Sequence, residues 1–98
     1  KKKKKKKLVP NALYWLGETY YVQQQFSEAA RIFAQGYQDH PESNKTQDNL
    51  LKLGLSLSGM GKKEDACIAL LQLAKQGTKE TPVVSRAQQE AKKLGCSS

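Results

Sequence analysis

The sequence contains only one histidine, His40, and two cysteines, Cys67 and Cys96, and these residue types are the ones most often used as a catalytic base, a nucleophile or a metal ligand. A cysteine or serine nucleophile needs a base and an orienting group close by, and a tetrahedral metal site needs several converging ligands. His40 directly precedes Pro41 in a connector, and both cysteines fall in the other half of the chain. We therefore expect no catalytic, cofactor-binding or metal-ligating residues, and no enzymatic activity.

The two cysteines have a simpler chemistry open to them, which is a disulfide bond. Cys67 falls near the start of one predicted helix, and Cys96 follows the end of the next. If these helices are antiparallel neighbours, the two ends lie on the same side of the domain. A Cys67–Cys96 bond would close a loop of about 30 residues and would suit an oxidising compartment. The alternative is two unrelated thiols, with Cys67 as a small core residue and Cys96 in a loose tail.

A 37-residue step repeats in the sequence and shows which elements position these residues. The repeated pattern consists of apolar and small residues, first Leu13, Leu16, Gly17, Tyr20, Ala29 and Phe33, then Leu50, Leu53, Gly54, Leu57, Ala66 and Leu70. Such a period is typical of stacked helix–turn–helix units, in which each unit buries its apolar face on a neighbour. The expected fold is therefore all-α, a right-handed solenoid fragment of two helical hairpins plus a capping helix.

Helix caps and breakers predict the ends of five helices. Pro10 and the Thr81-Pro82 pair mark helix starts, Ser27 is expected to cap the second helix, and Gly95 ends the last one in a left-handed conformation. No segment alternates apolar and polar residues with period two, so we expect no strands. The expected helices cover residues 9–24, 27–40, 46–58, 63–76 and 82–94.

These helices predict the domain organisation and the core. Residues 8–98 should form one domain, with repeats at 10–46 and 47–80 and a capping helix at 81–95. The residues expected to be buried between the helices are Leu16, Tyr20, Ala29, Phe33, Leu53, Leu57, Ala66 and Leu70.

The formal net charge of +8 comes almost entirely from an unbroken lysine run at residues 1–7. A basic arm could bind phosphates or a membrane surface. No aromatic residue interleaves the lysines, and the composition changes abruptly at Leu8. We interpret the run as a segment added for expression or a placeholder for unidentified residues, and expect no nucleic-acid partner. No stretch approaches the ~20 apolar residues that span a bilayer, so no membrane insertion is expected.

The first copy of the repeat closely resembles the tetratricopeptide repeat. Residue types preferred in that family fall on Leu16, Gly17, Tyr20, Tyr21, Phe26, Ala29, Phe33 and Pro41. The second copy keeps Gly54 and Ala66 but has Lys63 where the first has Phe26. The resemblance implies a module that binds other proteins.

Two stretches are more specific than the general repeat. Asn11–Tyr21 and Asp48–Gly54 are similar to the C-terminal repeat domain of the YbgF (CpoB) family of Tol–Pal-associated periplasmic proteins, and the surroundings of Cys67 and Cys96 look alphaproteobacterial. The resemblance implies a periplasmic adaptor that contacts TolA and a bifunctional peptidoglycan synthase, and coordinates outer-membrane constriction with septal peptidoglycan synthesis during cell division. Members of that family form trimers through an N-terminal coiled coil. No heptads occur here, so we expect that part to be missing.

Tyr14, Glu18 and Tyr21 are spaced by four and three residues, so they share one face of the first helix. In the family this face lines a concave groove that binds protein. The expected groove is completed by residues of the third helix, Asp48, Leu51, Lys52 and Leu55. The alternative is a cytosolic scaffold or co-chaperone that binds a peptide in the same groove. A carboxylate clamp of that kind needs several basic residues, of which Lys52 is the main candidate here.

The first helix begins where an earlier repeat would normally pack. We therefore expect exposed apolar atoms around Ala12, Trp15 and Thr19. Exposed apolar patches tend to bind partners, so we expect another copy or the lysine segment to cover this one. Trp15 is interpreted as facing the absent neighbour rather than the groove.

Overall fold

A computed structural model describes residues 9–76 and 81–97 of the chain, so the lysine run lies outside the described residues. The described residues form five α-helices and contain no β-strand. The helices are α1 (Pro10–Val22), α2 (Phe26–Asp39), α3 (Thr46–Gly59), α4 (Lys63–Gln76) and α5 (Pro82–Leu94). The all-α class and the five predicted helices are confirmed, with ends that differ from the predicted ones by no more than two residues.

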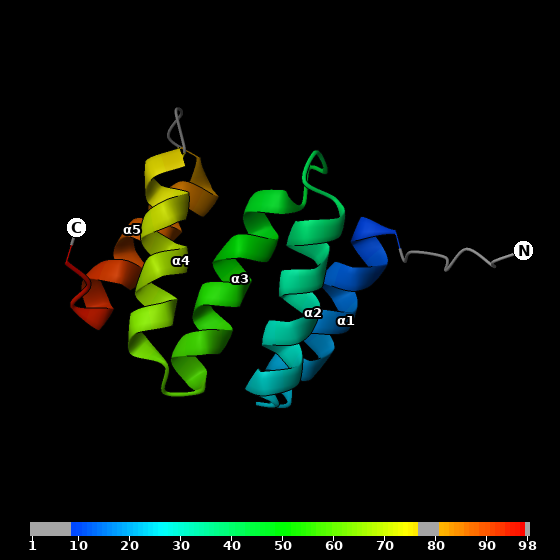
Figure 1. The fold of residues 1–98 in the computed structure, drawn as a ribbon, viewed down its shortest axis with the longest axis horizontal. Coiled ribbons are helices and arrows are strands. Elements are labelled where there is room, and N and C mark those ends of the chain that lie inside the picture. The colour runs from blue at the N-terminus through cyan, green and yellow to red at the C-terminus, as the bar shows by residue number, and fades with distance from the viewer. Residues whose placement is uncertain (1–8, 77–80, 98) are drawn as a thin grey trace, which may run out of the picture.

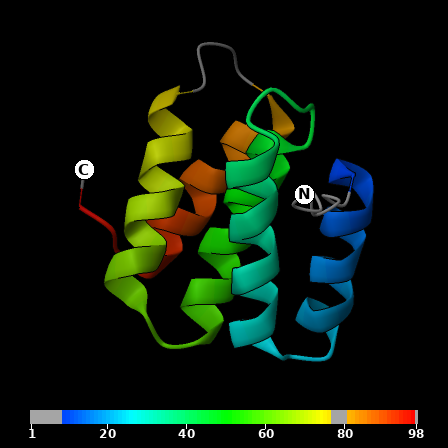
Figure 2. The same cartoon turned by 45° about the vertical axis from the view of Figure 1, so that its right-hand side comes forward.

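The helices stand in two layers (Figures 1 and 2). One layer contains α1, α3 and α5, and the other contains α2 and α4. Each helix packs against the next one in the chain, and α3 also packs against α5. As a result α1 and α5 lie at opposite ends of the stack (Figure 1). In this open arrangement α1, α3 and α5, which begin the successive helical units, lie together on one side of the molecule.

Local chemistry explains where the last helix begins and ends. The Thr81 hydroxyl accepts a hydrogen bond from the Val84 N–H at 3.2 Å, and Pro82 occupies the first helical position, where a missing N–H costs nothing. Gly95 follows the helix with φ of 76°, a conformation that favours glycine. Both predicted signals are confirmed.

The start of α2 differs from the prediction. Ser27 does not cap this helix, which begins at Phe26 after Gln25 and has no side-chain cap. Gln24 adopts a left-handed φ of 62°, and the N–H groups of Gln24 and Gln25 bond back to α1 carbonyls at 2.9 Å. This tight turn completes the reversal before Ser27, so the chain re-enters helical geometry one residue early.

Glycines let the helices of each hairpin approach closely. A Cβ added to Gly17 would lie 2.6 Å from Phe33 Cε1, and one added to Gly54 would lie 2.8 Å from Leu70 Cδ2. Both distances are far shorter than the van der Waals contact of about 3.5–4 Å between carbon atoms. The repeated glycines therefore set the spacing between α1 and α2 and between α3 and α4.

Burial is confirmed for four of the eight residues that were predicted to form the core. Ala29, Phe33, Ala66 and Leu70 are each fully buried. The other four, Leu16, Tyr20, Leu53 and Leu57, are only half-buried, so this part of the prediction was wrong. The space inside the hairpins is filled by residues nearer the helix starts, Leu13 and Leu50. Leu53 and Leu57 instead line a cleft between α2, α3 and α4.

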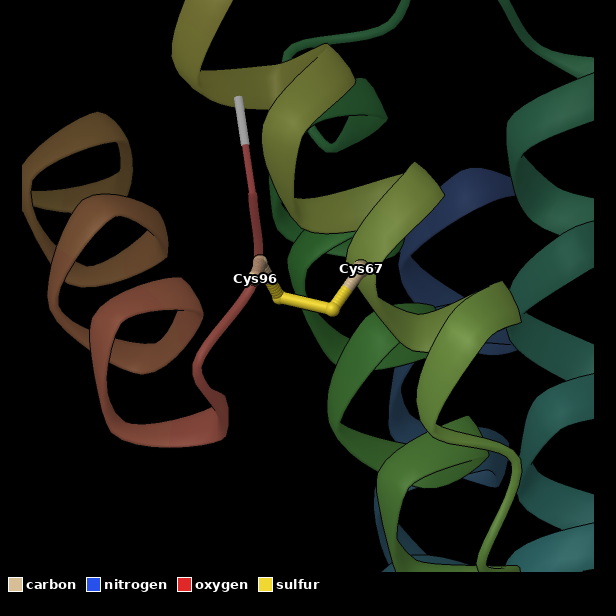
Figure 3. Close-up of a disulfide and its surroundings, with 2 residues drawn as sticks. All are labelled: Cys67 and Cys96. Atoms are coloured by element: carbon tan, nitrogen blue, oxygen red, sulfur yellow. A yellow bond between two sulfur atoms is a disulfide. The ribbon is translucent and has the colours of Figure 1, made fainter.

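Cys67 on α4 and Cys96 after α5 are joined by a disulfide, with Cα atoms 5.5 Å apart (Figure 3). The two helices are antiparallel neighbours (Figure 1). The Cys96 N–H donates to the Ala91 carbonyl at 2.9 Å, which folds the chain back directly after Gly95. The structure therefore agrees with the predicted pairing.

Candidate protein-binding surface

Side chains of α1 and α3 meet in the layer that contains α1, α3 and α5. Lys52 Nζ lies 3.2 Å from Glu18 Oε1, and the Tyr14 hydroxyl donates to the other oxygen of Glu18 at 3.2 Å. The Lys52 and Glu18 side chains are only 19% and 21% exposed. The structure thus joins three of the predicted groove residues in one hydrogen-bonded group that spans the junction of α1 and α3.

Lysine ammonium groups lie over the aromatic rings of α1. Lys52 Nζ is 5.0 Å from the centre of the Tyr21 ring. Lys45 Nζ, directly before α3, is 4.6 Å from the Tyr14 ring centre and 5.9 Å from that of Trp15. Each such contact contributes about 0.5–1 kcal/mol at an exposed site. These contacts link Lys45 and Lys52 to the aromatic side chains of α1.

Both tyrosines of this cluster stay protonated at neutral pH. Burial raises the pKa of Tyr14, and the nearby carboxylates of Glu18 and Asp48 raise it further. Burial also raises the pKa of Tyr21, whereas the Arg86 charge lowers it and the Glu90 charge raises it. Tyr21 is therefore close enough to two α5 residues to respond to their charges.

Residues of α5 extend this surface, and the sequence analysis missed them. Arg86 Nε donates to Glu90 Oε2 at 2.9 Å, and Lys93 Nζ lies 3.6 Å from the same oxygen. The hydrogen bond from Arg86, reinforced by the charges of Lys93 and Arg86, holds the pKa of Glu90 below its usual value, although partial burial opposes this shift.

The 37-residue repeat could have predicted that α5 contributes to this surface. A further step from Leu50 and Gly54 reaches Ala87 and Ala91, which are both buried on α5. The helix therefore takes the place of the first helix of a third unit. As such a first helix, α5 contributes Arg86 and Glu90 to the layer that also contains α1 and α3.

Two predicted groove residues lie beneath α5. Leu51 and Leu55 are 6% and 8% exposed, and they share a core cluster with Val84, Ala87 and Ala91. Tyr14 is similarly buried, at 9% exposed, and Asp48 is half-buried. The more accessible part of the predicted groove, together with the α5 residues that extend it, is here called the α1–α3–α5 surface. It consists of Glu18, Tyr21, Lys52, Arg86 and Glu90.

The histidine and the two cysteines do not converge on one site. His40 directly follows the end of α2, whereas Cys67 on α4 is bonded to Cys96, which follows α5. Within residues 9–76 and 81–97, no group of three or more histidine, cysteine or acidic side chains is arranged to hold a metal ion. No helix in those ranges is long and apolar enough to cross a membrane.

Comparison with known families follows the two hairpins. The family model of the tetratricopeptide repeat matches residues 11–43 and 48–76, which together make up more than half of the chain. The first range covers nearly all of α1 and all of α2, and the second covers most of α3 and all of α4. No curated protein matches the chain.

Proposed function

Because this chain belongs to the tetratricopeptide repeat family, we propose that it binds a segment of a partner protein on the α1–α3–α5 surface. Tetratricopeptide repeats are protein-interaction modules and are typically non-enzymatic. The observation that carries the proposal is the row formed by Tyr21, the Glu18–Lys52 pair and the Arg86–Glu90 pair. Three successive helices of one layer contribute to this row.

The chemistry of the surface favours a partner segment of mixed character. Glu18 and Lys52 are already paired, as are Glu90 and Arg86, so neither sign of charge dominates. Tyr21 adds a half-buried aromatic ring beside them. Tyrosine and arginine are enriched among the residues that dominate binding energy. A segment with an apolar anchor flanked by hydrogen-bonding groups fits this arrangement.

We further propose that the protein is a periplasmic adaptor of the Tol–Pal system, with TolA and a bifunctional peptidoglycan synthase as partners. The similarity of Asn11–Tyr21 and Asp48–Gly54 to that family supports this assignment. The Cys67–Cys96 bond is compatible with it, because disulfides persist in oxidising compartments such as the periplasm. In this proposal the adaptor coordinates outer-membrane constriction with septal wall synthesis, and the full-length protein forms trimers.

A cytosolic scaffold that clamps a peptide carboxylate fits the surface less well. Lys52, the main basic candidate for such a clamp, is paired with Glu18 and packed over the Tyr21 ring. A carboxylate ligand would have to displace Glu18 from a half-buried ion pair, which would leave that residue's charge without its partner.

Calorimetric titration with a TolA fragment and with the soluble part of the synthase tests the proposal. Tyr21→Ala should weaken binding by more than ~1 kcal/mol without unfolding the domain. Lys52→Ala should also weaken binding, whereas Lys75→Ala, an exposed lysine on α4, serves as the matched control and should leave affinity unchanged. Equal affinities for all variants would show that the α1–α3–α5 surface is not the binding site.

A further inference from the structure

The outward-facing side of α4 carries an apolar centre between two opposite charges. This stripe, here called the α4 stripe, consists of Glu64, Ile68, Leu71 and Lys75. Ile68 is 65% exposed, the two charged residues are exposed, and Leu71 is half-buried. Together with Gln72, the last three residues of the stripe line an open hollow of about 480 Å³. The α4 stripe therefore offers both an exposed apolar side chain and a hollow that is able to receive one.

The internal repeat shows that these positions face outward even when another helical unit follows. A 37-residue step relates the α4 stripe to Ser27, Arg31, Ala34 and Gln38 of α2. A second hairpin follows α2, yet Arg31 and Gln38 remain exposed and Ala34 is half-buried. The exposure of the α4 stripe is therefore a property of its place in the unit. What differs is the chemistry, because α4 has Ile68 where α2 has Arg31.

The α4 stripe is complementary to itself. Glu64 precedes Ile68 by four residues, Leu71 follows Ile68 by three, and Lys75 comes four residues later. If two copies of α4 pack antiparallel about a two-fold axis midway between Ile68 and Leu71, these two residues face each other across the contact. Glu64 of each copy then faces Lys75 of the other. Spacings of four, three and four keep such a stripe straight along a second helix that crosses at about 20°.

The charges at the two ends of the α4 stripe have no opposite charge to pair with in their own chain. In the part of the chain that the structure describes, neither Glu64 nor Lys75 forms an ion pair. Asp65 is exposed beside Glu64 and adds a second acidic group at this end. Lys63, which begins α4, reaches instead toward Gly95, where its Nζ lies 3.8 Å from an added Cβ. The acidic end is therefore able to meet the basic end of another copy.

We propose that the α4 stripe is the contact surface of a symmetric homodimer, in which α4 packs antiparallel on α4 of a second copy. Ile68 of each copy enters the hollow beside Leu71 of the other, and two Glu64–Lys75 ion pairs flank this contact. A second copy fits because a two-fold interface brings the same surface of both chains together, so that surface must complement itself.

This contact goes beyond the proposed function, because α4 lies in the layer opposite the α1–α3–α5 surface (Figures 1 and 2). Both copies of the α1–α3–α5 surface therefore stay open in the dimer, and each is able to bind its own partner segment.

The exposed face of α1 specifies a second copy less well. Ala12, Trp15 and Thr19 on this face are exposed, as the sequence predicts. None of these residues is charged, so no pair of opposite charges fixes the orientation or register of another copy there. The α4 stripe has such a pair at symmetric positions.

The contact is small, so the dimer should be weak. Each copy contributes one stripe of a single helix, and interfaces that bury less than about 1,200 Å² are typical of weak complexes. We expect a dissociation constant between about 10 μM and 1 mM. At low micromolar concentrations the domain is then a monomer, so denaturation measured at such concentrations reports on the single chain.

Sedimentation equilibrium over protein concentrations of about 10 μM to 1 mM tests the proposal. An ionic strength of about 0.15 M screens the long-range repulsion between chains of net charge +8. The average mass should rise from that of a monomer toward that of a dimer, and no further. Ile68→Lys should weaken association by about tenfold or more, because it places a charge in the apolar contact. Gln88→Lys adds the same charge on the exposed side of α5 and should have no effect.

The domain should remain folded in the Ile68→Lys variant. The introduced lysine follows Glu64 by four residues, which is a favourable spacing for an ion pair on one helix. Circular dichroism of the variant should therefore match that of the wild type.

Two charge reversals test the antiparallel register. Glu64→Lys alone and Lys75→Glu alone should each weaken association by about fivefold or more, because like charges then face each other at both ends of the contact. An equimolar mixture of the two variants should restore association, since every facing pair between them has opposite charges. Lys75→Glu should bind the TolA fragment as the wild type does. Failure of the dimer is therefore distinguishable from failure of the proposed binding surface.

Three results would overturn the proposal. The first is a monomer at all concentrations up to about 1 mM, where even weak association is visible. The second is equal association of the wild type and Ile68→Lys, which would assign the contact to another face. The third is a mixture of Glu64→Lys and Lys75→Glu that associates no better than either variant alone, which would exclude the antiparallel register.

Discussion

Lys52 on α3 lies 3.2 Å from Glu18 on α1, so a half-buried ion pair joins the first helices of the two repeats across the proposed binding surface. Lys52 also covers the Tyr21 ring, and Glu18 accepts a hydrogen bond from Tyr14. The contacts that present these side chains to a partner therefore also link α1 to α3. Binding measurements on Lys52 variants need a parallel measurement of stability for this reason.

The two hairpin glycines should respond differently to alanine. Gly17→Ala pushes a Cβ into the Phe33 ring, which is fully buried, and overpacking of this kind costs about 1–3 kcal/mol. In Gly54→Ala the clashing atoms are Cδ2 and Cγ of Leu70, at 2.8 and 2.9 Å, on a buried aliphatic side chain that changes rotamer more easily than a rigid ring tilts. Alanine also gains about 1 kcal/mol of helix propensity over glycine at both sites. Urea denaturation should show a clear loss for Gly17→Ala and a smaller one for Gly54→Ala. The reverse order would contradict this packing.

Phe33 should be a major contributor to the stability of the domain. Its side chain is fully buried and contacts Tyr14, with ring centres 5.8 Å apart. Phe33→Ala should lower the free energy of unfolding by about 3–5 kcal/mol. Ile68→Ala, at a residue that is 65% exposed on α4, is the control and should change it by less than ~0.5 kcal/mol. Similar losses for both variants would mean that the hairpin core is elsewhere.

The disulfide should stabilise the domain and hold α5 in place. It links residues 29 apart in sequence. On the chain-entropy account, a loop of about 30 residues contributes roughly 3–4 kcal/mol. Reduction should therefore lower the urea midpoint of the wild type and speed amide exchange in α5. The double variant Cys67→Ser/Cys96→Ser should be insensitive to reductant. Two free thiols in oxidised, denatured protein would exclude the bond.

Glu90 should make stability depend on pH in the acid range. Because its folded pKa lies below the ordinary value of 4.5, the unfolded chain takes up the proton first as the pH falls. The stabilisation is therefore present above about pH 4.5 and is lost as the pH falls through the folded pKa. Arg86→Gln removes the main cause and should raise the pKa of Glu90, measured by NMR of its carboxyl carbon. An unchanged pKa in Arg86→Gln would contradict the assigned cause.

The local features of the fold could be predicted from the sequence because their causes lie within a few residues. Pro10, Thr81 and Gly95 mark helix ends through backbone restrictions that act locally. Ser27 failed as a cap because the left-handed turn at Gln24 completes the reversal before it. That turn depends on hydrogen bonds to α1 carbonyls, and no residue type in the connector requires it.

The candidate surface was harder to predict because it depends on how α5 crosses α3. Helical spacing correctly grouped Tyr14, Glu18 and Tyr21 on one face, and it paired that face with Lys52. The burial of Leu51 and Leu55 follows from the packing of α5 residues against them, a contact between distant parts of the chain. Spacing within α3 cannot reveal that contact.

An NMR titration is the most direct test of whether a partner segment binds to the α1–α3–α5 surface. The ¹⁵N-labelled domain is titrated with the TolA fragment, and the change in each amide resonance is followed. We expect the largest changes at Glu18, Tyr21, Lys52, Arg86 and Glu90, and little change at Arg31 and Ile68 in the opposite layer. Largest changes on α2 and α4, or none at a saturating fragment concentration, would contradict this expectation.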